Sequence, residues 1–293
     1  MPSSARRAAE GVAARNVVWS SMTEAPINIA VSGAAGCMGA LIIKAALAQP
    51  QHYRLRAALD RPDCPRLGED AGTVAGARPA GIKITASLES AVDVLIDFSA
   101  PAGARLRLEQ CVRGKIPLLI GTTGLTDADQ RAIDQAAGTI AVLQTANTSL
   151  GINVLLHIAA QVARRLGTAY DVEIVEAHHN QKKDAPSGTA LALAEAICRA
   201  TDRAPEATII YGRHGPDAGR QPGSIGIHAV RLADVVGEHS IYFAAAGERI
   251  ELKHIATARE TFARGALRAA EFLAGRKHGR YTMADVLGLA AGA

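Results

Sequence analysis

The feature that most constrains the fold of this chain is an apolar segment that runs directly into a glycine-rich turn. Residues 27–33 read INIAVSG, and a segment with a helical pattern, MGALIIKAALAQ, follows over residues 38–49. The glycines of the turn stand three residues apart, at Gly33, Gly36 and Gly39. Such glycines permit a tight turn and let a pyrophosphate approach the backbone at the amino end of the helix. The segment therefore predicts the first strand, turn and helix of a Rossmann-type, dinucleotide-binding domain.

Strands and helices continue to alternate through the first half of the chain. YRLRAALD (53–60) alternates polar and apolar residues, and near-continuous apolar runs follow at 91–99, 116–124 and 139–147. Continuous apolar runs are typical of strands that helices cover on both faces. A helical segment begins after Pro101, between two of these runs. This order predicts a parallel sheet with right-handed crossovers.

Asp60 ends the second predicted strand, about 20 residues beyond the glycine turn, which is the usual place for an acid that recognises ribose. Its carboxylate can accept hydrogen bonds from the adenosine ribose hydroxyls of NAD. Arg61 comes next, and its guanidinium can instead pair with the 2′-phosphate of NADP. The two residues together leave both NADH and NADPH open as cofactors.

The pattern changes after Asn147. A helix is predicted over 150–167, then a strand over 171–179 and a helix over 188–200. The later segment VVGEHSIYFAAAGERIELKHI predicts an antiparallel hairpin that turns at Ala246-Gly247, and the chain closes with a helix. This order predicts a mixed α/β domain with an open sheet.

These patterns divide the chain into two expected domains. Residues 27–148 form the N-terminal parallel-sheet domain, which a C-terminal helix within 258–293 completes, and residues 149–257 form the mixed domain. Residues 1–26 are rich in Arg, Ser and Ala, and we expect them to be a disordered extension outside the fold.

The loop EAHHNQKKDAPSGTA gathers proton carriers and cations in front of a predicted helix. His178 and Lys182 are candidate acid–base groups, because imidazole and a partly desolvated ammonium can exchange protons near neutral pH. Ser187 is a candidate N-cap, and the amides of Gly188 and Thr189 at the helix start would suit a carboxylate. Surface histidines, a solvated KKD cluster and an ordinary helix cap are the alternatives to a functional loop.

Composition and spacing argue against several other classes of protein. Aromatic residues make up 3% of the chain, too few for a surface that stacks on single-stranded nucleic acid, and the formal net charge is only +4. The four cysteines contain no CxxC pair and the adjacent histidines lack HxxxH spacing, so neither a disulfide framework nor a metal site is predicted. Scattered cysteines of this kind suit a reducing cytoplasm, where we expect the protein. No apolar run approaches the roughly 20 residues of a membrane helix.

Six motifs occur in order along the chain: VSGAAGCMG, IDFSAP, GTTG, EAHHNQKKDAPSGTA, VGEHSIYF and TFARGA. Through them, the chain from about Ile27 onward closely resembles the 4-hydroxy-tetrahydrodipicolinate reductase (dihydrodipicolinate reductase) family of lysine biosynthesis. The resemblance implies reduction of the cyclic dicarboxylic imine formed when 4-hydroxy-tetrahydrodipicolinate loses water, with NADH or NADPH as cofactor and tetrahydrodipicolinate as product. It also implies a homotetramer assembled through the second domain.

The resemblance implies a role for each matching residue. His178 would be the proton donor or acceptor and Lys182 a proton donor, and the implied substrate contacts are His179, Ser187, Gly188 and Thr189. The implied dinucleotide contacts are Gly33, Ala34, Ala35, Gly36, Cys37, Met38, Asp60, Arg61, Gly121, Thr122, Thr123, Thr145, Ala146, Asn147 and Thr148. Cys37 stands where the family usually has arginine, which weakens the expectation of an NADPH preference. Thr148 stands where an aromatic residue is frequent, which leaves the packing of the nicotinamide open.

Other dehydrogenases fit the chain less well. A short-chain dehydrogenase needs Tyr-x-x-x-Lys, and none of the five tyrosines is followed by lysine four positions on. Aspartate-semialdehyde dehydrogenase needs a cysteine nucleophile, whereas Cys198 falls inside a predicted apolar helix. The remaining alternative is a non-catalytic dinucleotide sensor on the same fold. Such a protein would have no need of His178, Lys182 and an anion site together.

Overall fold

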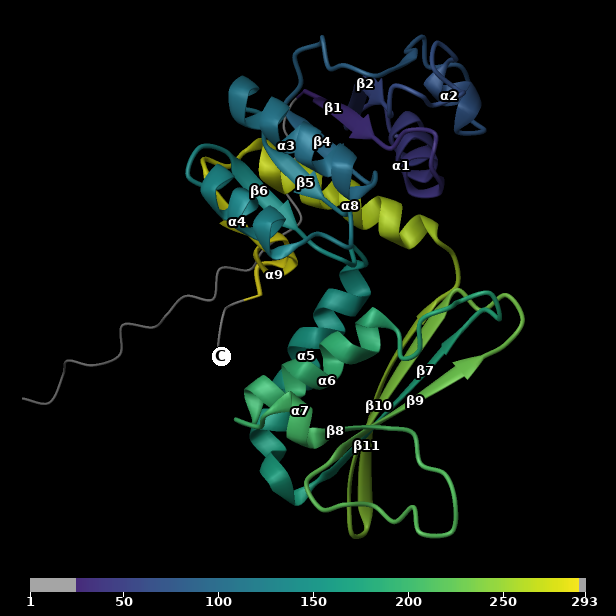
Figure 1. Ribbon diagram of the computed structural model, residues 1–293, viewed down its shortest axis with the longest axis vertical. Helices are drawn as coiled ribbons and strands as arrows, with labels where there is room; N and C mark the ends of the chain where they lie inside the picture. Colours follow the sequence, from purple (N-terminus) through teal and green to yellow (C-terminus); the bar gives the residue numbers. More distant parts are fainter. Residues whose placement is uncertain (1–24, 290–293) are drawn as a thin grey trace, which may run out of the picture.

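The apolar runs of the first half of the chain form a seven-stranded sheet in which all neighbouring strands are parallel (Figure 1). The computed structural model describes residues 25–289, so nearly all of the extension expected over 1–26 lies outside the described residues. The strand order is β12-β6-β5-β4-β1-β2-β3. The strands are β1 (Ile27–Ser32), β2 (Tyr53–Leu59), β3 (Ile84–Thr85), β4 (Val94–Asp97), β5 (Leu118–Ile120), β6 (Ala141–Gln144) and β12 (Gly279–Tyr281).

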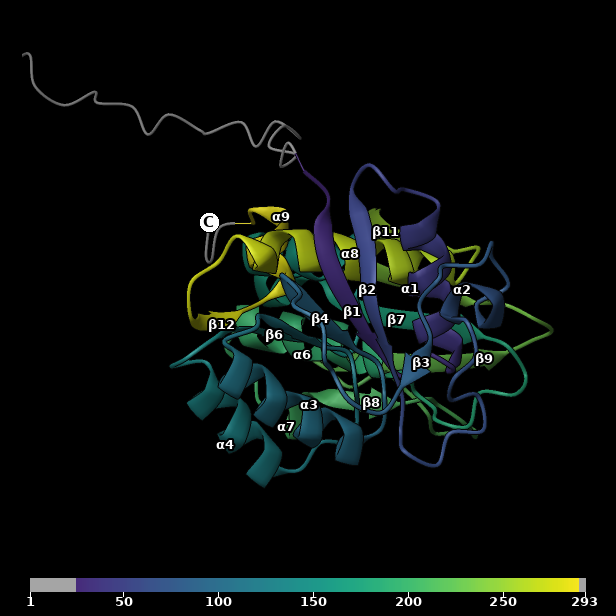
Figure 2. The ribbon, with the colours of Figure 1, turned by 90° about the horizontal axis from the view of Figure 1, so that it is seen from above.

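Helices cover both faces of this sheet, as the continuous apolar runs require (Figure 2). One face packs against α1, α8 and α9, and the other against α3 and α4. The helices of this part are α1 (Cys37–Leu47), α2 (Ala71–Val74), α3 (Pro101–Gly114), α4 (Asp127–Ala136), α8 (Glu260–Ala274) and α9 (Met283–Leu287). Strand order reverses between β1 and β4, so the crevice at their carboxyl ends is the expected ligand site of such a sheet.

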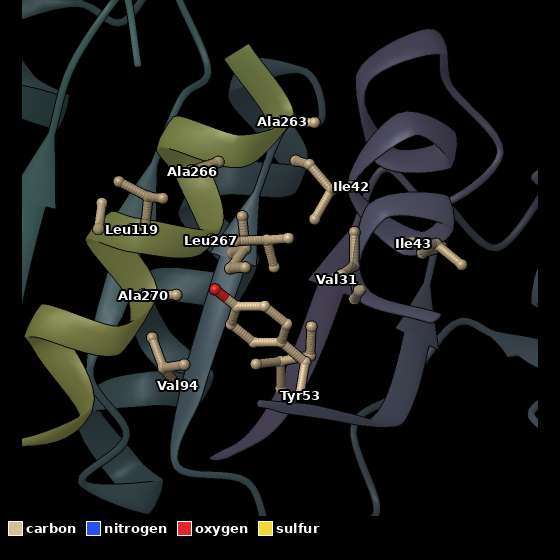
Figure 3. Packing of buried hydrophobic residues seen from close by; sticks show 14 of the residues in the cluster. Val31, Ile42, Ile43, Tyr53, Val94, Leu119, Ala263, Ala266, Leu267 and Ala270 are labelled. Carbon is tan, nitrogen blue, oxygen red and sulfur yellow. The ribbon is translucent and has the colours of Figure 1, made fainter. Parts of the chain in front are cut away.

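The helix α8 joins the carboxyl-terminal part of the chain to the core of the first sheet (Figure 3). Leu267 is 1% exposed and shares this core with Ile42 of α1 and Val31 of β1. Ala263, Ala266 and Ala270 face the same core, and their small side chains let the helix lie close to α1 and the sheet.

The second half of the chain forms a five-stranded mixed sheet in the order β11-β10-β7-β9-β8. Its elements are α5 (Leu150–Leu166), the 3-10 helix η1 (Gly167–Ala169), β7 (Asp171–His178), α6 (Gly188–Ala200), α7 (Pro205–Thr208), β8 (Ile209–Tyr211), β9 (Ile225–Arg231), β10 (Gly237–Ala245) and β11 (Glu248–Ala256). The strand β7 is parallel to β9 and antiparallel to β10. The helices α5 and α6 cover one face, where Ile174, Leu193 and Phe243 share a core. The hairpin of β10 and β11 turns at 246–247, which confirms the prediction.

The carboxyl end differs from the prediction of a single closing helix within 258–293. The helix α8 ends at Ala274, and the chain then adds β12 parallel to β6 before the short helix α9. A three-residue strand is too short to show a periodic pattern, so only its pairing with β6 identifies it. No helix in residues 25–289 is both long and apolar enough to span a bilayer.

Candidate active site

The turn after β1 has the geometry that a dinucleotide site needs. Gly33 has φ +78°, and a Cβ there would lie 2.3 Å from the carbonyl oxygen of Phe98. A Cβ on Gly39 would lie 2.0 Å from the carbonyl oxygen of Gly33. Only glycine fits at either position, because a Cβ on Gly33 would clash with the backbone after β4 and a Cβ on Gly39 would push α1 away from the turn. Ala34 is buried in this turn, and its amide donates to the carbonyl oxygen of Leu59.

The start of α1 is open to an anion. Gly36 is its N-cap and offers no side chain, and the amides of Cys37 and Met38 donate no hydrogen bond to any residue in 25–289. Unpaired amides at a helix start bind phosphate well. Asp60 lies beside this turn and accepts a hydrogen bond from the amide of Ala35 at 2.9 Å. The residues present therefore fit the pyrophosphate and ribose of NADH or NADPH.

Two further turns stand at the carboxyl ends of β5 and β6. Gly121 packs against the ring of Phe98, and Thr123 is exposed. Thr122 is 6% exposed and its hydroxyl donates to Asp97 at 2.6 Å, so a dinucleotide could reach only its backbone. After β6, Thr145 is half-buried and donates to the carbonyl oxygen of Asn147, while Ala146 is exposed.

Thr148 does not face this crevice. It is 2% exposed, and its hydroxyl donates to the carbonyl oxygen of Phe262 at 2.7 Å. The expected nicotinamide contact of this side chain is therefore blocked by its packing beneath α8. The side chain of Arg61, in contrast, is exposed and forms an ion pair with Asp63 at the surface.

The strand β7 ends at His178, beside the start of α6. The Nδ1 atom of His178 lies 2.7 Å from a carboxylate oxygen of Glu176, on the same face of the strand. His179 comes after the last residue of β7, and its carbonyl oxygen accepts from the amide of Lys182. The ammonium of Lys182 pairs with Asp184 at 2.8 Å, which lowers the pKa of that carboxyl.

Among the described residues, two backbone amides at the start of α6 have no hydrogen-bond partner. Ser187 is its N-cap, as expected, and its hydroxyl accepts from the amide of Ala190 and lies 3.0 Å from Nε2 of His239. Because this side chain is 3% exposed, it supports the helix start and is not available for a direct substrate contact. The amides of Gly188 and Thr189 donate to no residue that the structure describes. Both amides therefore remain open at the start of the helix, as an anion site would require.

A cavity of about 40 Å³ lies where the two halves of the chain meet. Asn147 lines it from the end of β6, and His178 and Thr189 line it from the second half. The side-chain Nδ2 atom of Asn147 donates to the hydroxyl of Thr189 at 3.0 Å across this junction. The cavity is also lined by Ile152, Val236, Gly237, His239, His254, Ala256 and Phe262. Lys182 is not among its lining residues.

Three polar residues of this site were absent from the predicted set. Glu176 is fully buried, and Arg231 from the end of β9 pairs with it. His239 lies behind Ser187, and burial, reinforced by the neighbouring His178, lowers its pKa to about 3. Strand alternation places Glu176 on the same face as His178, a signal that the sequence contains. Arg231 and His239 carry no such signal, because only strand pairing brings them here.

Comparison with protein families agrees with this geometry. Residues 27–148 match the family model described as dihydrodipicolinate reductase, N-terminus, and residues 151–287 match the model for its C-terminus. The chain belongs to the dihydrodipicolinate reductase family. The 4-hydroxy-tetrahydrodipicolinate reductase of Burkholderia lata is 45% identical over 90% of this chain and 100% of its own length. The enzyme of the same name from an Anaeromyxobacter species is 46% identical over 90% of this chain and 98% of its own.

Solved structures show the same fold. A dipicolinate-bound dihydrodipicolinate reductase from Paenisporosarcina sp. TG-14 superposes with a TM-score of 0.67 at 24% identity, covering 88% of this chain and 97% of its own. An amine dehydrogenase from Mycobacterium smegmatis has a TM-score of 0.55 at 11% identity over 90% of this chain and 96% of its own. The two-sheet architecture is thus shared within the family and beyond it.

Proposed function

We propose that this chain reduces the dehydrated form of 4-hydroxy-tetrahydrodipicolinate to tetrahydrodipicolinate with NADH or NADPH, in lysine and diaminopimelate biosynthesis. The names of relatives that match the chain over 90% of its length support this reaction. The observation that carries the proposal is the cavity that Asn147, His178 and Thr189 line together, because it joins the dinucleotide end of the parallel sheet to His178 and the start of α6. The two expected domains, 27–148 with 258–293 and 149–257, would close around it.

In this proposal the helix α6 holds the substrate. A ring carboxylate accepts hydrogen bonds from the amides of Gly188 and Thr189, where the helix dipole stabilises negative charge. The hydroxyl of Thr189 adds a polar contact, and His179 lies at the edge of the same loop. A substrate fixed at one end in this way is oriented before reaction, which contributes to the rate.

The residues that supply protons, His178 and Lys182, precede the carboxylate site in the chain. Nicotinamide, when bound, supplies the hydride, and negative charge then develops toward the ring nitrogen. Lys182 and His178 stabilise that charge and deliver the proton. Lys182 leaves its ion pair with Asp184 to do so, an exchange that costs little because the pair lies near the surface.

A coupled assay tests the reaction. Aspartate semialdehyde, pyruvate and the preceding synthase are mixed with the purified chain, and oxidation of NADH or NADPH is followed by absorbance. We expect turnover with at least one cofactor. A chain that binds either dinucleotide but never oxidises it would instead be a non-catalytic sensor.

Lys182→Ala tests the assigned roles in the same assay. We expect a fall in kcat of about 100-fold or more, since a general acid is lost, with an unchanged Kd for NADH by fluorescence titration. Lys183→Ala is the matched control, because the neighbouring Lys183 is exposed, and should retain the wild-type rate. A loss of NADH affinity in Lys182→Ala would contradict the role given to this residue.

Cofactor choice is decided by comparing the two dinucleotides in one further variant. Arg61→Ala removes an exposed guanidinium that we expect to meet the 2′-phosphate. We expect a weaker Kd for NADPH, by about tenfold, and an unchanged Kd for NADH. Equal effects on both would show that Arg61 does not read the 2′ position.

We also propose a cytoplasmic homotetramer assembled through the five-stranded sheet. Support comes from apolar side chains left exposed on its strands and their ends, among them Val230, Leu232 and Ile255. Exposed apolar residues that gather on one sheet mark interaction surfaces. Sedimentation velocity should give the mass of four chains, and Ile255→Lys should lower that mass.

A further inference from the structure

Glu176 holds three separate parts of the site with one carboxylate. Its side chain is fully buried. One oxygen lies 2.7 Å from Nδ1 of His178, and the other accepts from the amide of Ser187 at 3.0 Å. Arg231 donates to both oxygens, at 2.8 and 2.9 Å. The same arginine donates to the carbonyl oxygen of Asp184, in the loop that carries Lys182.

The charge on Glu176 determines which nitrogen of His178 carries a proton. Burial alone raises the pKa of this carboxyl, but hydrogen bonds from His178, Arg231 and Ser187 outweigh it and hold the pKa at about 2. At neutral pH the group is therefore an acceptor only, so Nδ1 of His178 must be the donor. The other ring nitrogen, Nε2, lies next to Gly237, a lining residue of the cavity.

We propose that Glu176 is the positioning residue of the proton carrier. It fixes the neutral tautomer of His178 with Nδ1 protonated, so that Nε2 takes up a proton from water in the cavity and then delivers that proton to the substrate. The carboxylate balances the charge of the ring while it is imidazolium. This inference rests on the proposed function, since His178 must act on the substrate. A carboxylate behind a catalytic histidine performs the same task in serine proteases.

Glu176 also sets the spacing between the proton carrier and the carboxylate site. Its bond to the amide of Ser187 fixes the residue directly before Gly188 and Thr189. The buried carboxylate thus links the end of β7 to the start of α6. The distance between His178 and the anion site is fixed by this link. A fixed separation matters because small displacements of reacting groups cost rate steeply.

A double-mutant cycle tests the inference. Glu176→Gln keeps the shape and removes the charge, and we expect kcat to fall by about tenfold or more with the Kd for NADH unchanged. In a His178→Ala background the same change should lower kcat by less than about twofold, because its effect is transmitted through the ring. Glu173→Gln is the matched control, since Glu173 is also held by arginines but points to the opposite face of β7.

The tautomer itself provides a readout that needs no turnover. Imidazole nitrogen-15 shifts of selectively labelled protein should show neutral His178 as the Nδ1-protonated form in the wild type. In Glu176→Gln we expect a mixture or the Nε2-protonated form. If Glu176→Gln fails to fold, Glu176→Asp serves instead, because it retains the charge for Arg231 but shortens the reach to Nδ1.

The outcomes separate this inference from the function. Equal losses in the presence and absence of His178, or an Nε2-protonated ring in the wild type, would overturn the role of Glu176. A wild-type chain that never oxidises the dinucleotide would overturn the proposed function, whereas the nitrogen-15 shifts would still report on the contact between Glu176 and His178.

Discussion

At the scale of single residues, Gly237 lies against Nε2 of His178 and leaves that atom uncovered by any side chain of its own. A Cβ at this position would lie 3.1 Å from that nitrogen, close enough to cover or displace it. We predict that Gly237→Ala lowers kcat by up to about 100-fold, because a displaced ring misses its partner, while NADH still binds. Gly219→Ala is the control, since a Cβ there meets nothing within 4 Å. An unchanged kcat in Gly237→Ala would mean that Nε2 is not the reactive atom.

The buried imidazole of His239 predicts a loss of stability in mild acid. Burial lowers its pKa from 6.5 to about 3, so the unfolded chain binds one more proton than the folded chain between these values. The stability that this group contributes is complete above pH 6.5 and declines by about 1.4 kcal/mol per pH unit as the pH falls toward 3. Glu176, also with a lowered pKa, adds to the decline only below its ordinary value of 4.5.

Urea unfolding at pH 6.5 and pH 4.5 isolates the effect of His239. The difference in unfolding free energy between the two pH values should shrink by roughly 2 kcal/mol in His239→Gln. His278→Gln, at an exposed histidine, should leave it unchanged. The same decline in His239→Gln as in the wild type would assign the acid sensitivity to other groups, such as His254, whose pKa burial also lowers.

At the scale of elements, α8 is part of the core of the first sheet although it begins more than a hundred residues after β6. We predict that Leu267→Ala lowers the unfolding free energy by about 2–5 kcal/mol, because a fully buried leucine leaves a cavity. Urea unfolding of the wild type and the variant measures this difference in unfolding free energy. Leu106→Ala, at a leucine of α3 that is 39% exposed, should cost less than about 1 kcal/mol in comparison. A small effect at Leu267 would mean that α8 contributes little to this core.

At the scale of the whole molecule, the bond from Asn147 to Thr189 links the two halves at the site. We predict that pyridine-2,6-dicarboxylate binds more tightly when NADH is present, by about fivefold or more, and that Asn147→Ala reduces this difference. Calorimetric titration with and without NADH measures the coupling. Asn28→Ala removes a comparable hydrogen bond to Asp93 far from the cavity and should leave the coupling intact. Full coupling in Asn147→Ala would exclude this link as its source.

Much of the fold could be predicted from local patterns. The turn at Gly33, the helix start at Ser187 and the hairpin turn at Ala246-Gly247 depend on backbone preferences of residues close in sequence. The continuous apolar runs identified a parallel sheet for the same reason, since burial on both faces leaves no polar alternation. The family followed from motifs in both halves, and the matched family models bear it out.

The amino-acid sequence by itself therefore determined the two kinds of sheet, the open helix starts and the residues able to carry protons. Tertiary structure alone decided that Thr148 is buried beneath α8, that β12 completes the first sheet, and that Glu176 meets Arg231. The pairing of β7 with β9 sets His178 opposite Arg231. That register depends on how both strands pack against α5 and α6, and a shift of one residue would turn every side chain to the other face.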